Sequence, residues 1–197
     1  MLIDENHFSA QRLNPVFPPA NREVNQVPIM VNFCRREQGF MLYSGNPKGI
    51  TSITDLTNPG IRLVNRSIST GTRHLFDREA KTAGIDPETI TGYHHEVNSH
   101  MEVGLEILSG GADMGLGIRP VATMLGLDFI PIRWERYDLM IAKDRFFDKP
   151  IQYFLGILQE AEFRKMANSL DGYDICATGK MVFAHEPVIQ EFDNRNV

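Results

Sequence analysis

Residues 61–76, IRLVNRSISTGTRHLF, carry the most informative fold signal of this chain. It begins with a strand-like run over residues 61–65 and passes through small residues into a helical run that starts near Thr70. The first amides of a helix have no partner inside the helix and carry the positive end of its dipole. A strand, a short loop and a helix N-terminus in this order indicate an α/β fold and a place that suits an anion.

The loop between this strand and helix carries the side chains that an anion site needs. An arginine stands on each side, hydroxyl groups add hydrogen-bond donors, and a glycine allows a ligand to approach the backbone. The sequence therefore predicts that the loop binds a small oxyanion or carboxylate, and the alternative is an ordinary capped helix with solvated arginines. The predicted contacts are Arg66, Ser69, Thr70, Gly71, Thr72 and Arg73.

Outward from this stretch, strand-like and helical runs alternate along the chain. This alternation predicts an α/β fold with mixed, mostly parallel sheets flanked by helices. Strands are expected over 27–34, 40–43, 61–65, 93–97, 113–117, 127–132 and 137–142, and helices over 70–83, 100–108, 120–125 and, in one or two pieces, 150–170.

Ligands of such sheets sit at the carboxyl ends of the strands, where a loop enters a helix. Asn98 and Ser99 occupy such a turn, and residues 117–120 occupy another. The sequence predicts that these turns and the loop before Thr70 converge on one pocket. In that pocket Glu96 and Ser99 are expected to contact the ligand, with Asn98 and His100 as further candidates. Capping or surface roles are the alternative for all of them.

Two further candidates lie outside these turns. Arg36 follows the buried strand-like run 27–34, and it either faces a cleft or belongs to an exposed charged turn. Tyr137 either donates a hydrogen bond to an oxyanion or packs at the rim of the core. The histidine-rich run 94–100 raises the question of a metal, but alternate strand residues point to opposite faces and no cysteine lies nearby. No metal and no cofactor are therefore expected.

Composition restricts the function classes. The chain has 197 residues and a formal charge of −5, which argues against broad nucleic-acid binding. Its apolar runs are too short for a membrane span, and its first residues lack the features of a secretory signal. Cys34 and Cys176 make no disulfide framework. Hydrolase elbow and P-loop signatures are missing, so the chain is expected not to be an enzyme.

A series of short motifs, in a specific order, resembles the PBP-like domain family, which has the type 2 periplasmic-binding-protein fold. The resemblance covers roughly residues 27–180. The motifs are REQG at 36–39, GNPKG at 45–49, DL at 55–56, PGIR at 59–62, NR at 65–66, STGTR at 69–73, AGIDP at 83–87, GGADMGLG at 110–117, LGLDF at 125–129, ERYDL at 135–139 and GYD at 172–174.

The resemblance implies a small-ligand-binding domain with an oxyanion such as molybdate or tungstate as the leading ligand. Related molybdate and tungstate binding proteins use an Arg and a Thr that flank a Ser-Gly turn, and Arg66 and Thr72 match that spacing around Thr70-Gly71. Similar domains are fused to molybdate-type regulators and to molybdopterin biosynthesis proteins. A ligand-sensing regulatory module is therefore one alternative, and a scaffold that no longer binds a ligand is another.

The resemblance also implies a domain organisation. We expect an irregular arm over 1–26, a binding-protein-like domain over 27–183 and a polar tail over 184–197. The second lobe spans about 50–135, and the other residues contribute to a first lobe that is incomplete. An incomplete lobe exposes a sheet edge, which predicts a homodimer with exchange of the arm. The expected compartment is the cytoplasm, or the periplasm if the chain is part of a secreted protein.

Overall fold

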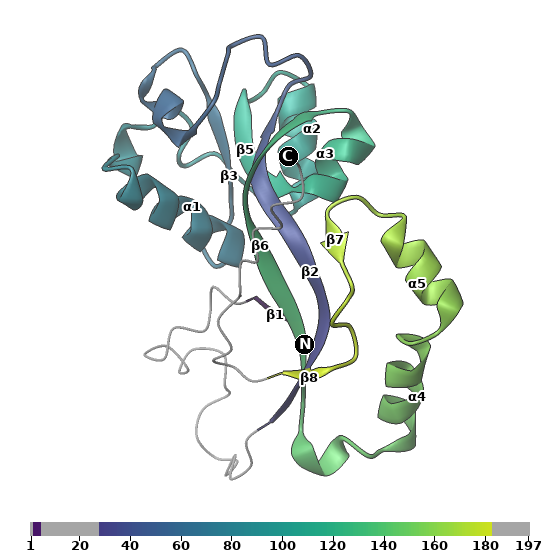
Figure 1. Cartoon of the computed structure of the whole chain (residues 1–197). Helices are drawn as coiled ribbons and strands as arrows, with labels where there is room; N and C mark the ends of the chain where they lie inside the picture. The colour runs from purple at the N-terminus through teal and green to yellow at the C-terminus, as the bar shows by residue number, and fades with distance from the viewer. Residues whose placement is uncertain (1, 5–27, 183–197) are drawn as a thin grey trace, which may run out of the picture.

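Two long antiparallel strands form the axis of the molecule. The structure is a computed structural model that describes residues 2–4 and 28–182. Strand β2 (Ile29–Leu42) lies beside strand β6 (Asp128–Ile141) over the whole length of both, from the lower end of the molecule into its upper lobe (Figure 1). The ladder shifts register at two places on β2, between Asn32 and Cys34 and between Gln38 and Gly39.

The upper lobe adds further strands to this pair. Strand β5 (Met114–Ile118) pairs antiparallel with β2, and β3 (Leu63–Arg66) pairs parallel with β5. Strand β4 (Glu96–Val97) pairs parallel with β3, which gives the order β1-β6-β2-β5-β3-β4. Because β5 runs against β2, its carboxyl end lies at the lower margin of the lobe.

Helices cover both faces of the upper sheet. Helix α1 (Gly71–Thr82) lies on one face, and α2 (His100–Leu108) with α3 (Arg119–Leu125) lies on the other (Figure 1). Successive strand residues point to opposite faces, so neighbours such as Leu63 and Val64 belong to different core clusters. The α1 cluster includes Leu75 and Phe76, and the α2–α3 cluster includes Val103, Ile107 and Val121.

The lower region is smaller. Strand β1 (Leu2–Asp4) pairs with β6, while β7 (Tyr173–Asp174) and β8 (Met181–Val182) pair with β2. Helices α4 (Lys149–Ile157) and α5 (Ala161–Asn168) lie beside them and bury none of their residues completely. Short 3-10 helices span Ile53–Thr57, Pro87–Thr89 and Lys143–Arg145. No helix among the described residues is long and apolar enough to cross a membrane.

The predicted fold class, a mixed α/β sheet flanked by helices, is confirmed. Parallel pairing is less extensive than expected, because β2 and β6 pair antiparallel with their neighbours. The sequence predicted two shorter strands in place of each of them. Both strands are continuous because pairing between them holds the polar residues in their middle in an extended conformation. Residues 2–4 form a strand rather than an irregular arm. The rest of that arm, and the tail 184–197, lie outside the described residues.

Candidate functional site

Three strand-to-helix turns meet at the lower margin of the upper lobe. Strand β3 leads into α1, β4 into α2 and β5 into α3. These strands are parallel neighbours, so their carboxyl ends share one edge of the sheet. Ile118, the last residue of β5, pairs with Gln38, and β2 therefore carries Arg36 past the same edge. This edge is where the upper lobe meets the lower region.

Arg36 is held rigidly on β2. Its Nε donates to Oε1 of the fully buried Glu135 on β6, and its Nη2 donates to the hydroxyl of Tyr137 at 2.9 Å. Its guanidinium also stacks on the Tyr137 ring, 4.1 Å from the centroid. The alternative prediction, that Arg36 belongs to an exposed charged turn, is therefore wrong. The residue lies inside a strand, and its side chain is mostly buried. Glu135 compensates its charge.

Arg66, the last residue of β3, has fewer hydrogen-bond partners than Arg36. Its Nη2 donates to the carbonyl oxygen of Asn98 at 2.9 Å. Its Nε is buried and has no hydrogen-bond partner in the described part of the chain, where no salt bridge joins Arg66 to a carboxylate either. Burial, and then the charge of Arg36, lower the pKa of Arg66. The site therefore carries a positive charge that its described residues do not neutralise directly.

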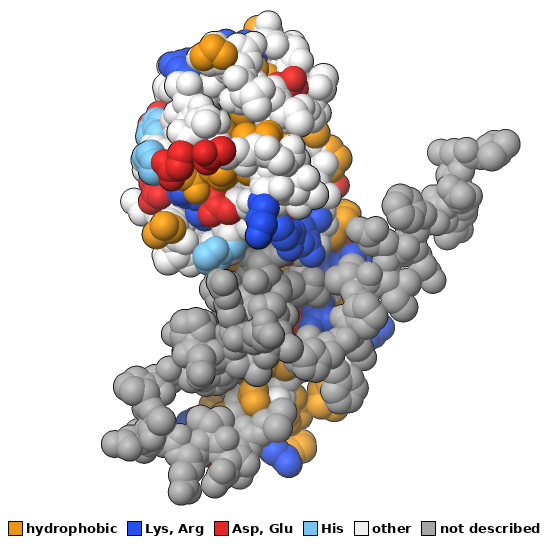
Figure 2. Space-filling view, turned by 90° about the vertical axis from the view of Figure 1, so that its left-hand side faces the viewer, with side chains coloured by type: hydrophobic (Ala, Val, Ile, Leu, Met, Phe, Trp, Pro, Cys, Tyr) orange, Lys and Arg blue, Asp and Glu red, His pale blue; other side chains and the backbone are white. Residues whose placement is uncertain are grey.

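His100, the first residue of α2, completes this arrangement. Its Nδ1 is buried without a hydrogen-bond partner among the residues described. Burial, and then the charges of Arg36 and Arg66, hold the pKa of His100 well below its usual range. We call Arg36, Arg66 and His100 the basic cluster. On the face shown in Figure 2, Lys and Arg side chains gather along the lower margin of the upper lobe.

Arg73 and Glu96, both predicted ligand contacts, bind each other. Arg73 is 2% exposed, and its Nη1 donates to Oε1 of Glu96 at 2.7 Å. Its Nε donates to Asp77 at 3.1 Å, and its guanidinium lies 4.2 Å from the centroid of the Tyr93 ring. This geometry gives Arg73 a structural role, tying α1 to β4 and the loop before it.

The predicted hydroxyl donors are mostly used by the protein itself. Thr70 caps α1, because its Oγ1 accepts from the amide of Arg73 at 3.2 Å, and Ser99 caps α2 in the same way. Thr72 is buried and its hydroxyl accepts from Nε2 of Gln38 at 3.4 Å. Ser69 is exposed in the loop, and Gly71 opens α1.

From the turn before α2, the sequence predicts Glu96 and Ser99 as ligand contacts and His100 as a further candidate. The signal for His100 was its place in the first turn of a helix that follows a strand. Glu135 and Gln38 were missed, because a buried polar residue inside a strand has no local pattern that separates it from a surface residue. Among the described residues, no group of three or more His, Cys, Asp or Glu could hold a metal ion.

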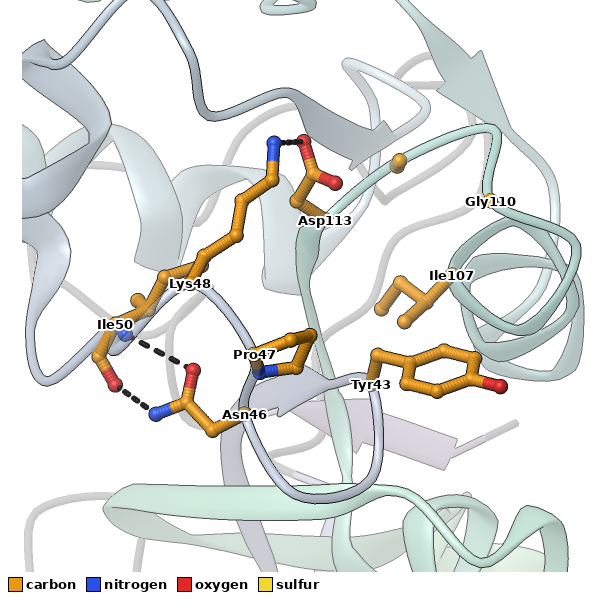
Figure 3. Close-up of a pocket in the computed structure, with 9 residues that line it drawn as sticks. Tyr43, Asn46, Pro47, Lys48, Ile50, Ile107, Gly110 and Asp113 are labelled. Carbon is orange, nitrogen blue, oxygen red and sulfur yellow. Dashed lines mark hydrogen bonds and ion pairs between the residues drawn. The ribbon is translucent and has the colours of Figure 1, made fainter.

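A separate pocket of about 100 Å³ lies at the opposite end of β5 (Figure 3). Nζ of Lys48 lies 2.9 Å from Oδ2 of Asp113 there, and Arg62 donates to the same carboxylate, so these cations already have an anionic partner within the protein. We do not assign an anion to this pocket. Its lining residues are Tyr43, Asn46, Pro47, Lys48, Ile50, Ile107, Gly110, Ala112 and Asp113.

Solved structures share this fold. PEB3 bound to L-phospholactate superposes with a TM-score of 0.54 at 15% identity, covering 74% of this chain and 68% of PEB3. A two-component system protein that mediates signal transduction gives 0.54 at 12% identity, covering 79% and 62%. An ancestral arginine-binding protein bound to arginine gives 0.50 at 15% identity, covering 78% and 68%. At these identities the likeness shows the fold alone.

Sequence comparison shows the family. The uncharacterized protein YvgK of Bacillus subtilis (strain 168) is 31% identical over 153 residues, which are 78% of this chain and 49% of YvgK. The chain thus spans about half the length of that relative. An uncharacterized protein from the 5′ region of a 2Fe-2S ferredoxin gene in Clostridium pasteurianum is 35% identical over 109 residues, 55% of this chain and 96% of that protein. The PBP superfamily domain model matches residues 8–159, and the chain belongs to this family.

Proposed function

We propose that the chain binds a small oxyanion at the basic cluster, next to the N-termini of α1 and α2. The observation that carries this proposal is a pair of buried nitrogens, Nε of Arg66 and Nδ1 of His100, that have no hydrogen-bond partner among the described residues. A buried polar atom without a partner costs about 1–3 kcal/mol. A bound anion would accept hydrogen bonds from such groups and compensate the charge of Arg66.

The chemistry of the cluster favours a compact oxyanion. Guanidinium groups donate paired hydrogen bonds that match the oxygen atoms of carboxylates, phosphates and related anions. Arg36 is fixed by Glu135 and Tyr137, so it is oriented before a ligand arrives. The resemblance to molybdate and tungstate binding proteins makes these dianions the leading ligands. Sulfate, phosphate and small carboxylates suit the same donors.

Thermal unfolding against molybdate, tungstate, phosphate, sulfate and formate tests the proposal. A ligand at a hundredfold excess over its Kd stabilises the native state by about 2.7 kcal/mol. For a chain of this length that corresponds to a rise in Tm of roughly 5–10 °C. Arg66→Ala should weaken binding by about 2 kcal/mol or more, roughly thirtyfold. Arg145→Ala is the matched control, because this arginine is exposed and lies outside the cluster.

A response that falls to about a third or less in Arg66→Ala but is unchanged in Arg145→Ala supports the proposal. An equal response in both variants refutes the assignment of the cluster. No response of the wild-type chain to any anion favours the scaffold interpretation.

A ligand-sensing role is a second candidate, because the cluster joins two parts of the fold. Arg36 stands on β2, which continues into the lower region, whereas Arg66 and His100 belong to the upper lobe. A ligand held by all three would link the upper lobe to the axis strands and favour one arrangement of them. Sedimentation with and without molybdate tests this role: a ligand-dependent change in the predicted homodimer supports it, and an unchanged association constant argues for simple capture.

A further inference from the structure

The charges in and around the basic cluster do not cancel. Arg36 is paired with the buried carboxylate of Glu135, so these two contribute no net charge. Arg66 contributes one positive charge, which Glu102 attracts without a salt bridge between them. His100 contributes nothing while it is neutral. The cluster therefore matches a monoanion when His100 is neutral and a dianion when His100 is protonated.

We propose that His100 acts as the charge-matching residue of this site, which takes up one proton when a dianion binds and none when a monoanion binds. This inference rests on the proposed function, since it assigns a role within the same site. The geometry supports it because Nδ1 of His100 is buried, has no hydrogen-bond partner among the described residues, and shares its surroundings with both arginines.

The charged groups around His100 explain why it is neutral before a ligand binds. Arg36 from β2 and Arg66 from β3 repel the imidazolium, and burial disfavours it further. The positive end of the α2 dipole acts in the same direction. The carboxylates that act on these two arginines are engaged: Glu135 accepts from Arg36, and Glu102, which attracts Arg66, accepts from the amide of Asn98 at 2.8 Å in the cap of α2.

A bound dianion reverses this situation. Its two negative charges outweigh the repulsion from Arg66 and stabilise the imidazolium, which raises the pKa of His100. Between the lowered pKa of the free protein and the raised pKa of the complex, binding takes up a proton. Affinity for the dianion should therefore fall by about tenfold per pH unit between these two pKa values and level off above the pKa of the complex.

Titration calorimetry with molybdate in buffers of different ionisation enthalpy counts the protons taken up. It is run at about pH 7 and about pH 8.5, both above the usual histidine pKa of about 6.5, where molybdate is a dianion. Nitrate serves as the monoanion. In at least one of these conditions we expect uptake close to one proton per molybdate, no uptake with nitrate, and no uptake with molybdate in His100→Gln.

His94→Gln is the control, because His94 is exposed and pairs with Glu88 away from the cluster, and this variant should keep the uptake. Molybdate binding without proton uptake at either pH would overturn the inference and leave the proposed function standing. Equal uptake in wild type and His100→Gln would overturn it as well. No binding of molybdate or nitrate by the wild-type chain would overturn the inference, and the proposed function falls with it if tungstate, phosphate, sulfate and formate also give no thermal shift.

Discussion

Arg73→Ala should destabilise the native state without removing the response to anions. Arg73 is almost fully buried and makes hydrogen bonds to Glu96 at 2.7 Å and to Asp77 at 3.1 Å. Breaking a fully buried ion pair costs about 3–5 kcal/mol, and an exposed pair contributes about 0–1 kcal/mol. Both carboxylates are 34% exposed, so water screens them once the arginine is gone.

The stacking of Arg73 on Tyr93 adds about 1 kcal/mol, between the values for exposed and desolvated pairs, because the arginine is buried and the ring is partly exposed. We therefore expect Arg73→Ala to lower the free energy of unfolding by about 2–3 kcal/mol in urea denaturation. With a saturating anion, the variant should still gain the same stabilisation as the wild type. A loss below about 0.5 kcal/mol would refute the structural role of Arg73. If the variant loses about 2–3 kcal/mol and also no longer responds to the anion, Arg73 would instead be a ligand contact, as the sequence predicts.

Two further predictions concern the packing and the pH dependence of the upper lobe. Gly115→Val should lower the free energy of unfolding by about 1–3 kcal/mol in urea denaturation, because a Cβ at this position would lie 2.5 Å from Cγ1 of Val103; an unchanged midpoint would contradict this packing. Burial alone would raise the pKa of Asp113, but hydrogen bonds from Arg62 and Lys48 outweigh it and lower this pKa to about 2, below its usual value of 3.8. This stabilisation is complete above about pH 4 and is lost as pH falls toward 2. Asp113→Asn should therefore flatten the acid limb of a profile of stability against pH. An acid limb identical to that of the wild type would contradict this prediction.

The sequence was sufficient for the fold class because the signals that define it are local. Helix α2 begins after the Ser99 cap, as predicted from the residue type, and α1 begins at Gly71, next to the predicted start near Thr70. Helix α3 ends at Gly126, which adopts the left-handed conformation that a glycine permits. The continuity of β2 and β6 was not predictable, because their polar central residues are held by pairing between segments about a hundred positions apart.

The candidate site was only partly predictable, because its local signals do not show which side chains have distant partners. Arg66 was identified from its place between a strand and a helix, and the structure leaves its Nε without a described partner. Arg73 has the same local signature, but distant partners from the segment 93–96 satisfy it. Local sequence shows which residues can bind an anion. It does not show which of them are already paired by the rest of the fold.

Crystals of the full chain soaked with tungstate would show directly whether the basic cluster binds an oxyanion, because the anomalous signal of tungsten locates the bound ion. We predict one strong peak within hydrogen-bonding reach of Arg66, His100 and Arg36, and no such peak in Arg66→Ala crystals. A peak elsewhere, for example beside Lys48, with none at the basic cluster would contradict the assignment of the anion site.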